Sequence, residues 1–235
     1  EADMLNRLLL TATLDGQAEA LTKLHALVKE RRPDGVLFAG RILGSNPISH
    51  AAKLKMWKDF FAGLGKLGVV AALVPGASDV PLREFLQLAK DAEIDHPNIR
   101  VAHATLFEEG NLALCGLAGD LTEAEDRSED RLCYARASAD YFLRTLWRVD
   151  PPYKVLLLSV TPHGKLGGET GNRICDEFID SYHPSLCLVA GATERRGFER
   201  IAHTLIINPG RLADGSFVWL DRNRSADQQV EFCKL

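Results

Sequence analysis

Short apolar runs alternate with stretches of helical period in the first half of the chain, and this alternation constrains the fold more than any other feature. Buried strands are predicted at the apolar runs 8–11, 36–39 and 69–74. Helices are predicted where apolar residues recur at helical spacing, over 21–28, 51–67 and 81–92. Strand–helix alternation implies parallel strands joined by right-handed crossovers. We therefore expect an α/β protein.

The second half predicts more strands and fewer helices. Strands are expected at 99–104, 112–117, 154–160 and 186–190, in two runs joined by a Gly- and Pro-rich turn within 203–221, and at an edge formed by 229–235. An amphipathic stretch covers 132–147, and a helix is predicted over 171–182. The acidic segment 120–130 is predicted to be a solvated loop and helix start, with a lid as the alternative. No repeat or linker interrupts the chain, so we expect one domain, 1–235, with two packed sheets.

Composition narrows the class of protein. A net charge of -4 and a pI near 6.0 argue against non-specific nucleic-acid binding, which needs a concentrated basic surface. No apolar stretch approaches the roughly 20 residues of a membrane span. The first residues do not resemble a signal peptide, although a removed leader remains open. The five cysteines are odd in number and lack metal-type spacing, which favours reduced, buried thiols and a cytoplasmic location.

Six turns follow the predicted strands, and most of them contain glycine. They read "TATLDG", "AGRIL", "PGASD", "SVTPHG", "AGATERRG" and "NPGRLADG". In this order, and with the terminal "INPGRLADGSFVWLD", the turns resemble those of the calcineurin-like metallophosphoesterase family over about 8–221. The likeness is greatest to a bacterial and archaeal branch in which the metal motifs are eroded. It implies a sandwich of two packed mixed β-sheets flanked by helices.

The resemblance also implies a pair of divalent cations that hydrolyse phosphate esters, but this chain lacks the expected ligands. The family's site positions are occupied here by Thr13, Asp15, Arg41, Ala77, Ser78, Asp79, Val160, Ala192 and Glu194. Arg41 stands where the resemblance expects the carboxylate that bridges the two metals. No metal is therefore expected. The alternative is a single Mn, Fe or Zn ion, for which Asp15 and Glu194 are the remaining oxygen donors.

The role of Arg41 has three possible interpretations. It is a solvated loop residue, or it forms an ion pair with Asp15 or Glu194, or it binds an anion. Further candidates for contact with an anion follow other strands, and they are His163, Arg195 and Arg211. Ser78 lacks a neighbour to activate it as a nucleophile and is expected to tighten its turn.

The leading hypothesis is a non-catalytic member of the family, a pseudo-phosphoesterase that binds or scaffolds a small anionic or phosphorylated ligand. The alternative is a divergent phosphomonoester or phosphodiester hydrolase with one metal held by Asp15, Glu194 and Asp79, or with a shifted site that uses His163. A structural role in a homo-oligomer is a third possibility.

Overall fold

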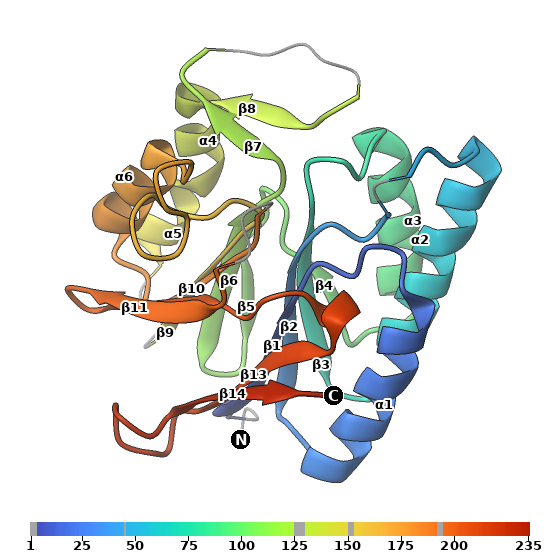
Figure 1. Ribbon diagram of the computed structural model, residues 1–235, viewed down its shortest axis with the longest axis horizontal. Coiled ribbons are helices and arrows are strands. Elements are labelled where there is room, and N and C mark those ends of the chain that lie inside the picture. The colour runs from blue at the N-terminus through green and yellow to red at the C-terminus, as the bar shows by residue number, and fades with distance from the viewer. Residues whose placement is uncertain (1–3, 45, 125–129, 150–152, 192–194) are drawn as a thin grey trace.

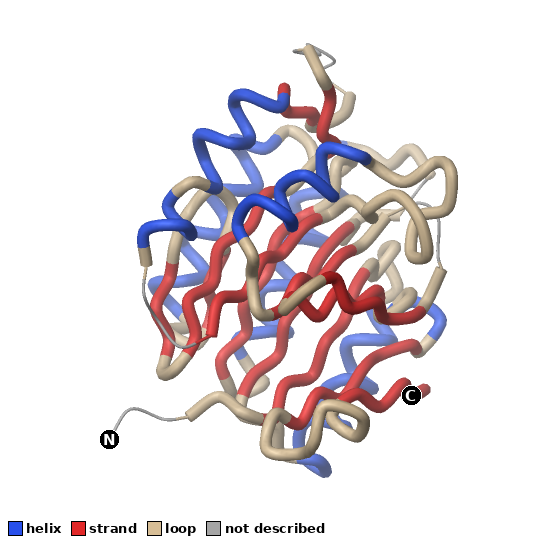
Figure 2. The backbone as a smooth tube through the Cα atoms, turned by 90° about the vertical axis from the view of Figure 1, so that its left-hand side faces the viewer, coloured by secondary structure: helices blue, strands red, loops and turns tan. Residues whose placement is uncertain are grey.

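Two β-sheets pack face to face in the computed structural model, and helices cover the outer face of each sheet (Figure 1). The structure describes residues 4–44, 46–124, 130–149, 153–191 and 195–235. Figure 2, turned by 90°, shows the strands with helices on either side. The described residues thus form the predicted α/β sandwich of two mixed sheets flanked by helices.

The first sheet has the strand order β14-β13-β1-β2-β3-β4. Its strands are β1 (Arg7–Ala12), β2 (Gly35–Gly40), β3 (Val70–Pro75), β4 (Ile99–Val101), β13 (Ser216–Asp221) and β14 (Val230–Lys234). Strands β1 to β4 are parallel, as the strand–helix alternation predicted, whereas β13 and β14 are antiparallel to their neighbours. The helices that cover this sheet are α1 (Ala18–Arg31), α2 (His50–Gly65) and α3 (Leu82–Asp95).

The second sheet has the strand order β11-β12-β10-β9-β6-β5. Its strands are β5 (Phe107–Glu109), β6 (Leu112–Leu117), β9 (Tyr153–Leu158), β10 (Leu186–Val189), β11 (Gly197–Ile201) and β12 (Thr204–Asn208). Its four inner strands are parallel, and each edge strand is antiparallel to its neighbour. The remaining elements are α4 (Arg136–Leu143), α5 (Thr145–Arg148), α6 (Arg173–Tyr182), the 3-10 helix η1 (Leu212–Asp214) and the parallel ribbon β7–β8, formed by Asp120–Thr122 and Cys133–Ala135.

Alternating side chains divide the core into three layers. Leu37 of β2 packs between the two sheets, whereas its neighbour Phe38 packs against the helices of the first sheet. In β9, Leu157 faces the other sheet and Leu156 faces the helices of the second sheet. Since successive side chains of a strand point to opposite faces, an unbroken apolar run is needed wherever both faces are covered. This explains why the central strands were recognisable as apolar runs.

Three parts of the second half differ from the sequence prediction. The amphipathic stretch 132–147 begins as strand β8, and its helix starts only at Arg136. The acidic segment begins as strand β7 rather than as a loop. The two strands around "NPGRLADG" do form, but β12 and β13 lie in different sheets, so the Gly- and Pro-rich segment carries the chain from one sheet to the other. The hydrogen-bond partner of each strand lies elsewhere in the chain, and local sequence does not specify it.

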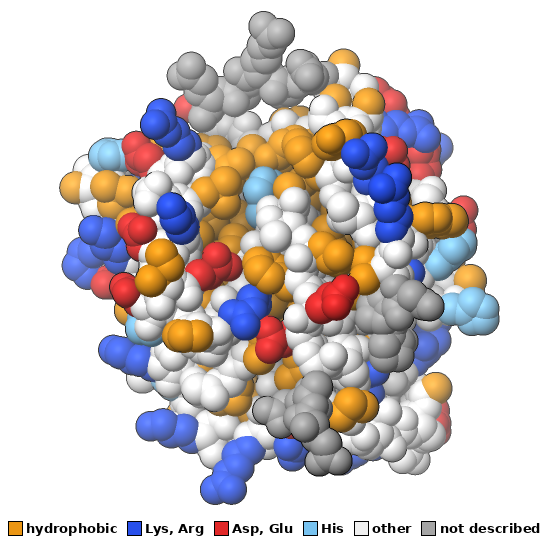
Figure 3. All heavy atoms as spheres, turned by 180° about the vertical axis from the view of Figure 1, so that it is seen from behind, with side chains coloured by type: hydrophobic (Ala, Val, Ile, Leu, Met, Phe, Trp, Pro, Cys, Tyr) orange, Lys and Arg blue, Asp and Glu red, His pale blue; other side chains and the backbone are white. Residues whose placement is uncertain are grey.

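All five cysteines are free, and four of them are buried. In the part of the chain that the structure describes, no helix has the length and apolar character of a membrane span. On the face seen in Figure 3, Lys and Arg side chains are interspersed with Asp and Glu.

Candidate functional site

A cavity of about 250 Å³ lies where the carboxyl ends of strands from both sheets meet. The turns after β1, β2, β3, β9 and β10 supply its walls, together with the β7–β8 ribbon and the segment before α6. Its lining residues include Thr13, Gly40, Arg41, Gly76, Ala77, Ser78, Asp120, Arg131, Ser159, Val160, Thr161, Thr170, Asn172 and Gly191. The edge formed by the carboxyl ends of strands is the usual place for ligands in open α/β sheets.

The turns after β1 and β2 run side by side beyond the ends of their strands. Leu14 N–H donates to the carbonyl of Arg41 at 2.7 Å, and Gly16 N–H donates to that of Ile42 at 2.8 Å. Gly40 permits this close approach. Its φ is +99°, and a Cβ there would lie 2.9 Å from the Thr13 Oγ1. The extended pairing brings the side chain of Asp15 beside that of Arg41.

Asp15 is the centre of an ion-pair network. Its Oδ1 accepts a hydrogen bond from Arg41 Nε, and its Oδ2 accepts one from Arg211 Nη2. The Asp15 side chain is only 6% exposed, whereas the two arginine side chains are 32% and 33% exposed. Of the three interpretations of Arg41, the structure therefore shows the ion pair with Asp15. Both oxygens of Asp15 are engaged, so neither is free to bind a metal.

Asp79 is fully buried and holds the second and third turns together. Its oxygens accept hydrogen bonds from the backbone N–H groups of Ile42, Leu43 and Gly76 at 3.0, 3.0 and 2.8 Å. They also accept one from Trp57 Nε1 at 3.3 Å. Burial raises the pKa of the Asp79 carboxyl, and the four hydrogen bonds act in the opposite direction. Asp79 is thus engaged in the structure of the turns and does not line the cavity.

The other family site positions that the structure describes carry small or apolar side chains and line the cavity. They are Thr13, Ala77, Ser78 and Val160. Ser78 does not tighten its turn through its hydroxyl as predicted, because its Oγ has no hydrogen-bond partner among the described residues. Asp79 bonds to Gly76 N–H and closes the turn instead. The remaining two positions, 192 and 194, lie outside the described residues.

Three predicted anion-binding residues do not line the cavity. His163 donates its backbone N–H to the carboxylate of Asp176 in α6. Burial raises the pKa of Asp176, and this hydrogen bond acts in the opposite direction. The guanidinium of Arg195 lies over Gly168. Arg211 is paired with Asp15 and with Asp214.

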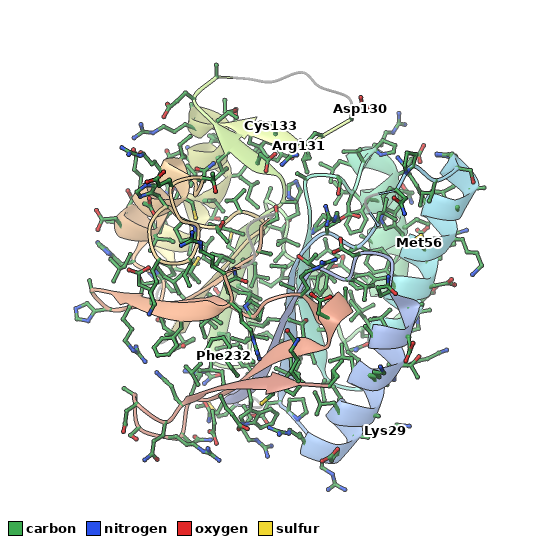
Figure 4. All side chains as sticks on the ribbon, in the orientation of Figure 1. Lys29, Met56, Asp130, Arg131, Cys133 and Phe232 are labelled. Atoms are coloured by element: carbon green, nitrogen blue, oxygen red, sulfur yellow. The ribbon has the colours of Figure 1, made fainter. Side chains whose placement is uncertain are left out.

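Arg131 lines the cavity but was not singled out from the sequence. It precedes β8, and its Nε donates to the carboxylate of Asp120, which also lines the cavity. Figure 4 labels Arg131 at the base of the β7–β8 ribbon, near the strand ends. The available signal was weak, since Arg131 is one basic residue directly after a stretch rich in acidic ones.

A buried histidine, His103, forms hydrogen bonds that hold the β7–β8 ribbon, near Asp120 and Arg131, against the end of β6. His103 Nδ1 accepts a hydrogen bond from Ala118 N–H at 3.0 Å, so the neutral ring carries its proton on Nε2 and donates it to the Tyr134 hydroxyl at 3.0 Å. Burial lowers the pKa of His103 to about 4. His103 therefore connects the end of β6 to the ribbon in its neutral form.

Acidification is expected to destabilise the protein through His103. The unfolded chain binds a proton near pH 6.5, whereas the folded protein binds it only near pH 4, so protonation favours unfolding between these values. At about 1.4 kcal/mol per pKa unit, the free energy of unfolding should fall by about 2–3 kcal/mol between pH 7 and pH 4. Chemical denaturation at a series of pH values measures this fall.

Two variants separate the contribution of His103 to the pH dependence of stability from that of the carboxyl groups, which also titrate at low pH. His103→Gln should remove most of this component of the pH dependence. Tyr134→Phe keeps the buried imidazole and removes only its hydroxyl partner, so it should retain the component. An unchanged pH dependence in His103→Gln would contradict the assignment.

Comparison with known proteins agrees with the fold. The family described as "metallophosphoesterase, calcineurin superfamily" matches residues 2–234, and the chain belongs to this family. The crystal structure of TT1561 from Thermus thermophilus is 27% identical, with a TM-score of 0.86 over 98% of this chain and 99% of that one. No curated protein matches the chain in sequence.

More distant structures share the fold alone. A dimetal phosphatase from Danio rerio is 12% identical, with a TM-score of 0.66 over 92% of each chain. An archaeal phosphodiesterase is 12% identical, with a TM-score of 0.53 over 97% of this chain and 99% of that one.

The described residues do not fit the two divalent cations that the family implies. Asp15 is shared between two arginines, Asp79 is engaged by four donors, and Asp120 is paired with Arg131. Within the described ranges, no three His, Cys, Asp or Glu side chains are grouped so that they could hold a metal. A dication about 4 Å from a guanidinium would be repelled by about 8 kcal/mol at an effective dielectric of about 20.

Proposed function

We propose that this protein binds a small anionic or phosphorylated ligand in the cavity at the strand ends and does not carry out dinuclear-metal hydrolysis. The observation that carries the proposal is the setting of Arg41. Its Nε is fixed by Asp15, while its terminal nitrogens have no hydrogen-bond partner among the described residues and the residue lines the cavity. A guanidinium held in this way presents a rigid fork of donors, which suits phosphate and carboxylate groups.

The hydroxyl groups of the cavity support the same function. Thr13, Ser78 and Thr161 line the wall around Arg41, and the Ser78 Oγ lacks a partner among the described residues. Hydroxyls donate hydrogen bonds to anionic oxygens. The alternative of a one-metal hydrolase finds less support, because Asp15 and Asp79 are already engaged and His163 does not line the cavity.

Calorimetric titration with inorganic phosphate tests the binding function. The wild-type protein should bind phosphate saturably, and Arg41→Gln should weaken this binding at least tenfold, which corresponds to about 1.4 kcal/mol. Arg83→Gln, at an exposed position of α3, is the matched control and should bind phosphate as the wild type does.

Metal content and hydrolytic activity test the proposal that the protein does not carry out dinuclear-metal hydrolysis. Elemental analysis for Mn, Fe and Zn should accompany assays with aryl phosphate monoesters and diesters. Stoichiometric metal with turnover above about 1 s⁻¹, the low end for enzymes, would overturn the proposal in favour of the divergent hydrolase. Absence of saturable binding at millimolar phosphate would overturn the anion-binding function.

A further inference from the structure

A second anchored guanidinium lines the same cavity as Arg41 and comes from a different part of the fold. Arg41 follows β2 of the first sheet, whereas Arg131 precedes β8 of the ribbon. Arg41 donates its Nε–H to the carboxylate of Asp15, and Arg131 donates its Nε–H to the carboxylate of Asp120. In neither residue do the terminal nitrogens have a hydrogen-bond partner among the described residues. Both side chains therefore keep their outer donors available.

Backbone hydrogen bonds fix the wall that carries Arg131. Leu132 N–H donates to the carbonyl of Ala77 at 2.7 Å, and Asp120 N–H donates to the carbonyl of Leu132 at 2.9 Å. The first of these bonds attaches the ribbon to the turn after β3, which itself lines the cavity. Arg131 is thus held close to the turns that carry the Arg41 site, although its side chain is 60% exposed.

We propose that Arg41 and Arg131 clamp one phosphate group between them, and that the ligand is a phosphate monoester rather than a phosphodiester. This inference rests on the anion-binding function proposed above and goes beyond it by defining the ligand class. A monoester carries a charge of about -1.5 to -2 at pH 7 and three terminal oxygens, enough for two guanidinium forks. A diester offers one charge and two such oxygens. The charged side chains among the described lining residues are those of Arg41, Arg131 and Asp120, and their net charge of +1 favours the dianion.

The phosphate group of the ligand titrates near neutral pH, so the affinity for the ligand should depend on pH in a characteristic way. The second pKa of a phosphate monoester is about 6, so the clamp should lose affinity for it as the pH falls below that value. The lining residues within the described ranges include no histidine or cysteine, and their charged groups are Arg41, Arg131 and Asp120. Asp15 contacts Arg41 and Arg211, and Asp214 contacts Arg211, but Asp15, Arg211 and Asp214 do not line the cavity. His103 contacts the ribbon through Tyr134, and its pKa is about 4. A change in affinity near pH 6 would therefore report the ligand.

AMP and 3′,5′-cyclic AMP test the proposal because they carry the same nucleoside on a monoester and a diester. Calorimetric titration of the wild-type protein at pH 7.5 should give AMP at least a tenfold tighter binding. This preference should shrink as the pH is lowered to 5. Arg131→Gln should weaken AMP at least tenfold and remove most of the preference, while Arg131→Lys, which keeps the charge but loses the fork, should be intermediate. Arg136→Gln, in a surface pair with Glu177, is the control.

The outcomes separate the clamp from the anion-binding function. If inorganic phosphate binds but AMP and cyclic AMP bind equally well, the clamp is wrong and the anion site stands. The clamp is also wrong if the wild type prefers AMP and Arg131→Gln retains the full preference. If neither phosphate nor AMP binds, the proposed function fails and the clamp fails with it.

Discussion

Replacing Asp79 by asparagine is expected to lower the free energy of unfolding by about 3–5 kcal/mol. One carboxylate oxygen becomes an NH₂ group that faces donors, so two of the four N–H groups that now bond to Asp79 lose their acceptor. Each buried donor left without a partner costs about 1–3 kcal/mol. The site is fully buried, so water does not replace the lost bonds.

Urea denaturation of Asp79→Asn against the wild type measures the loss. Asp91→Asn, an exposed position of α3, makes the same chemical change without burial and should stay within about 0.5 kcal/mol. Since Asp79 orders the turns that carry Arg41 and Ser78, phosphate affinity should also fall in any folded Asp79→Asn protein. A variant as stable as the wild type would contradict the structural role assigned to Asp79.

The fold was largely predictable because its central strands are buried on both faces. Covered strands such as β2 and β9 must be apolar throughout, and this makes them visible as runs. The edge strands β5 and β11 were missed for the opposite reason. They are short and only partly buried, so neither an apolar run nor a clean alternation marks them.

Partners that are distant in sequence limited the rest of the fold prediction. A Gly- and Pro-rich segment such as 208–216 has the same local character whether it closes a hairpin or carries the chain between sheets. Here the pairing of β12 with β10 and β11, and of β13 with β1 and β14, decides between the two. These pairings rest on burial of whole sheet faces, which no short window of sequence contains.

The candidate site shows the same division between local and distant information. The position of Arg41 at a strand end followed from the local pattern, and its pairing with Asp15 was one of the alternatives. The contact between Arg211 and Asp15 joins residues 196 positions apart, and only the sandwich brings them together. Arg131 reaches the cavity through the ribbon, whose strands looked like part of a loop and part of a helix.

Replacing Asp15 by asparagine is expected to lower the free energy of unfolding by about 3–4 kcal/mol. The substitution removes the charge that Arg41 and Arg211 share and leaves two guanidinium groups close together. Removing one partner of a buried ion pair costs about 3–5 kcal/mol. We expect the lower part of this range, because both arginine side chains are about a third exposed and can regain water.

A double-mutant cycle of Asp15→Asn with Arg41→Gln, followed by urea denaturation, should give a coupling energy of about 1–2 kcal/mol. Asp59→Asn removes an exposed carboxylate paired with Lys55 and should cost less than about 0.5 kcal/mol, which controls for loss of charge alone. The one-metal hydrolase predicts a different pattern, in which loss of Asp15 abolishes activity and leaves stability nearly unchanged. The same variant therefore distinguishes an aspartate that holds two arginines from one that holds a metal.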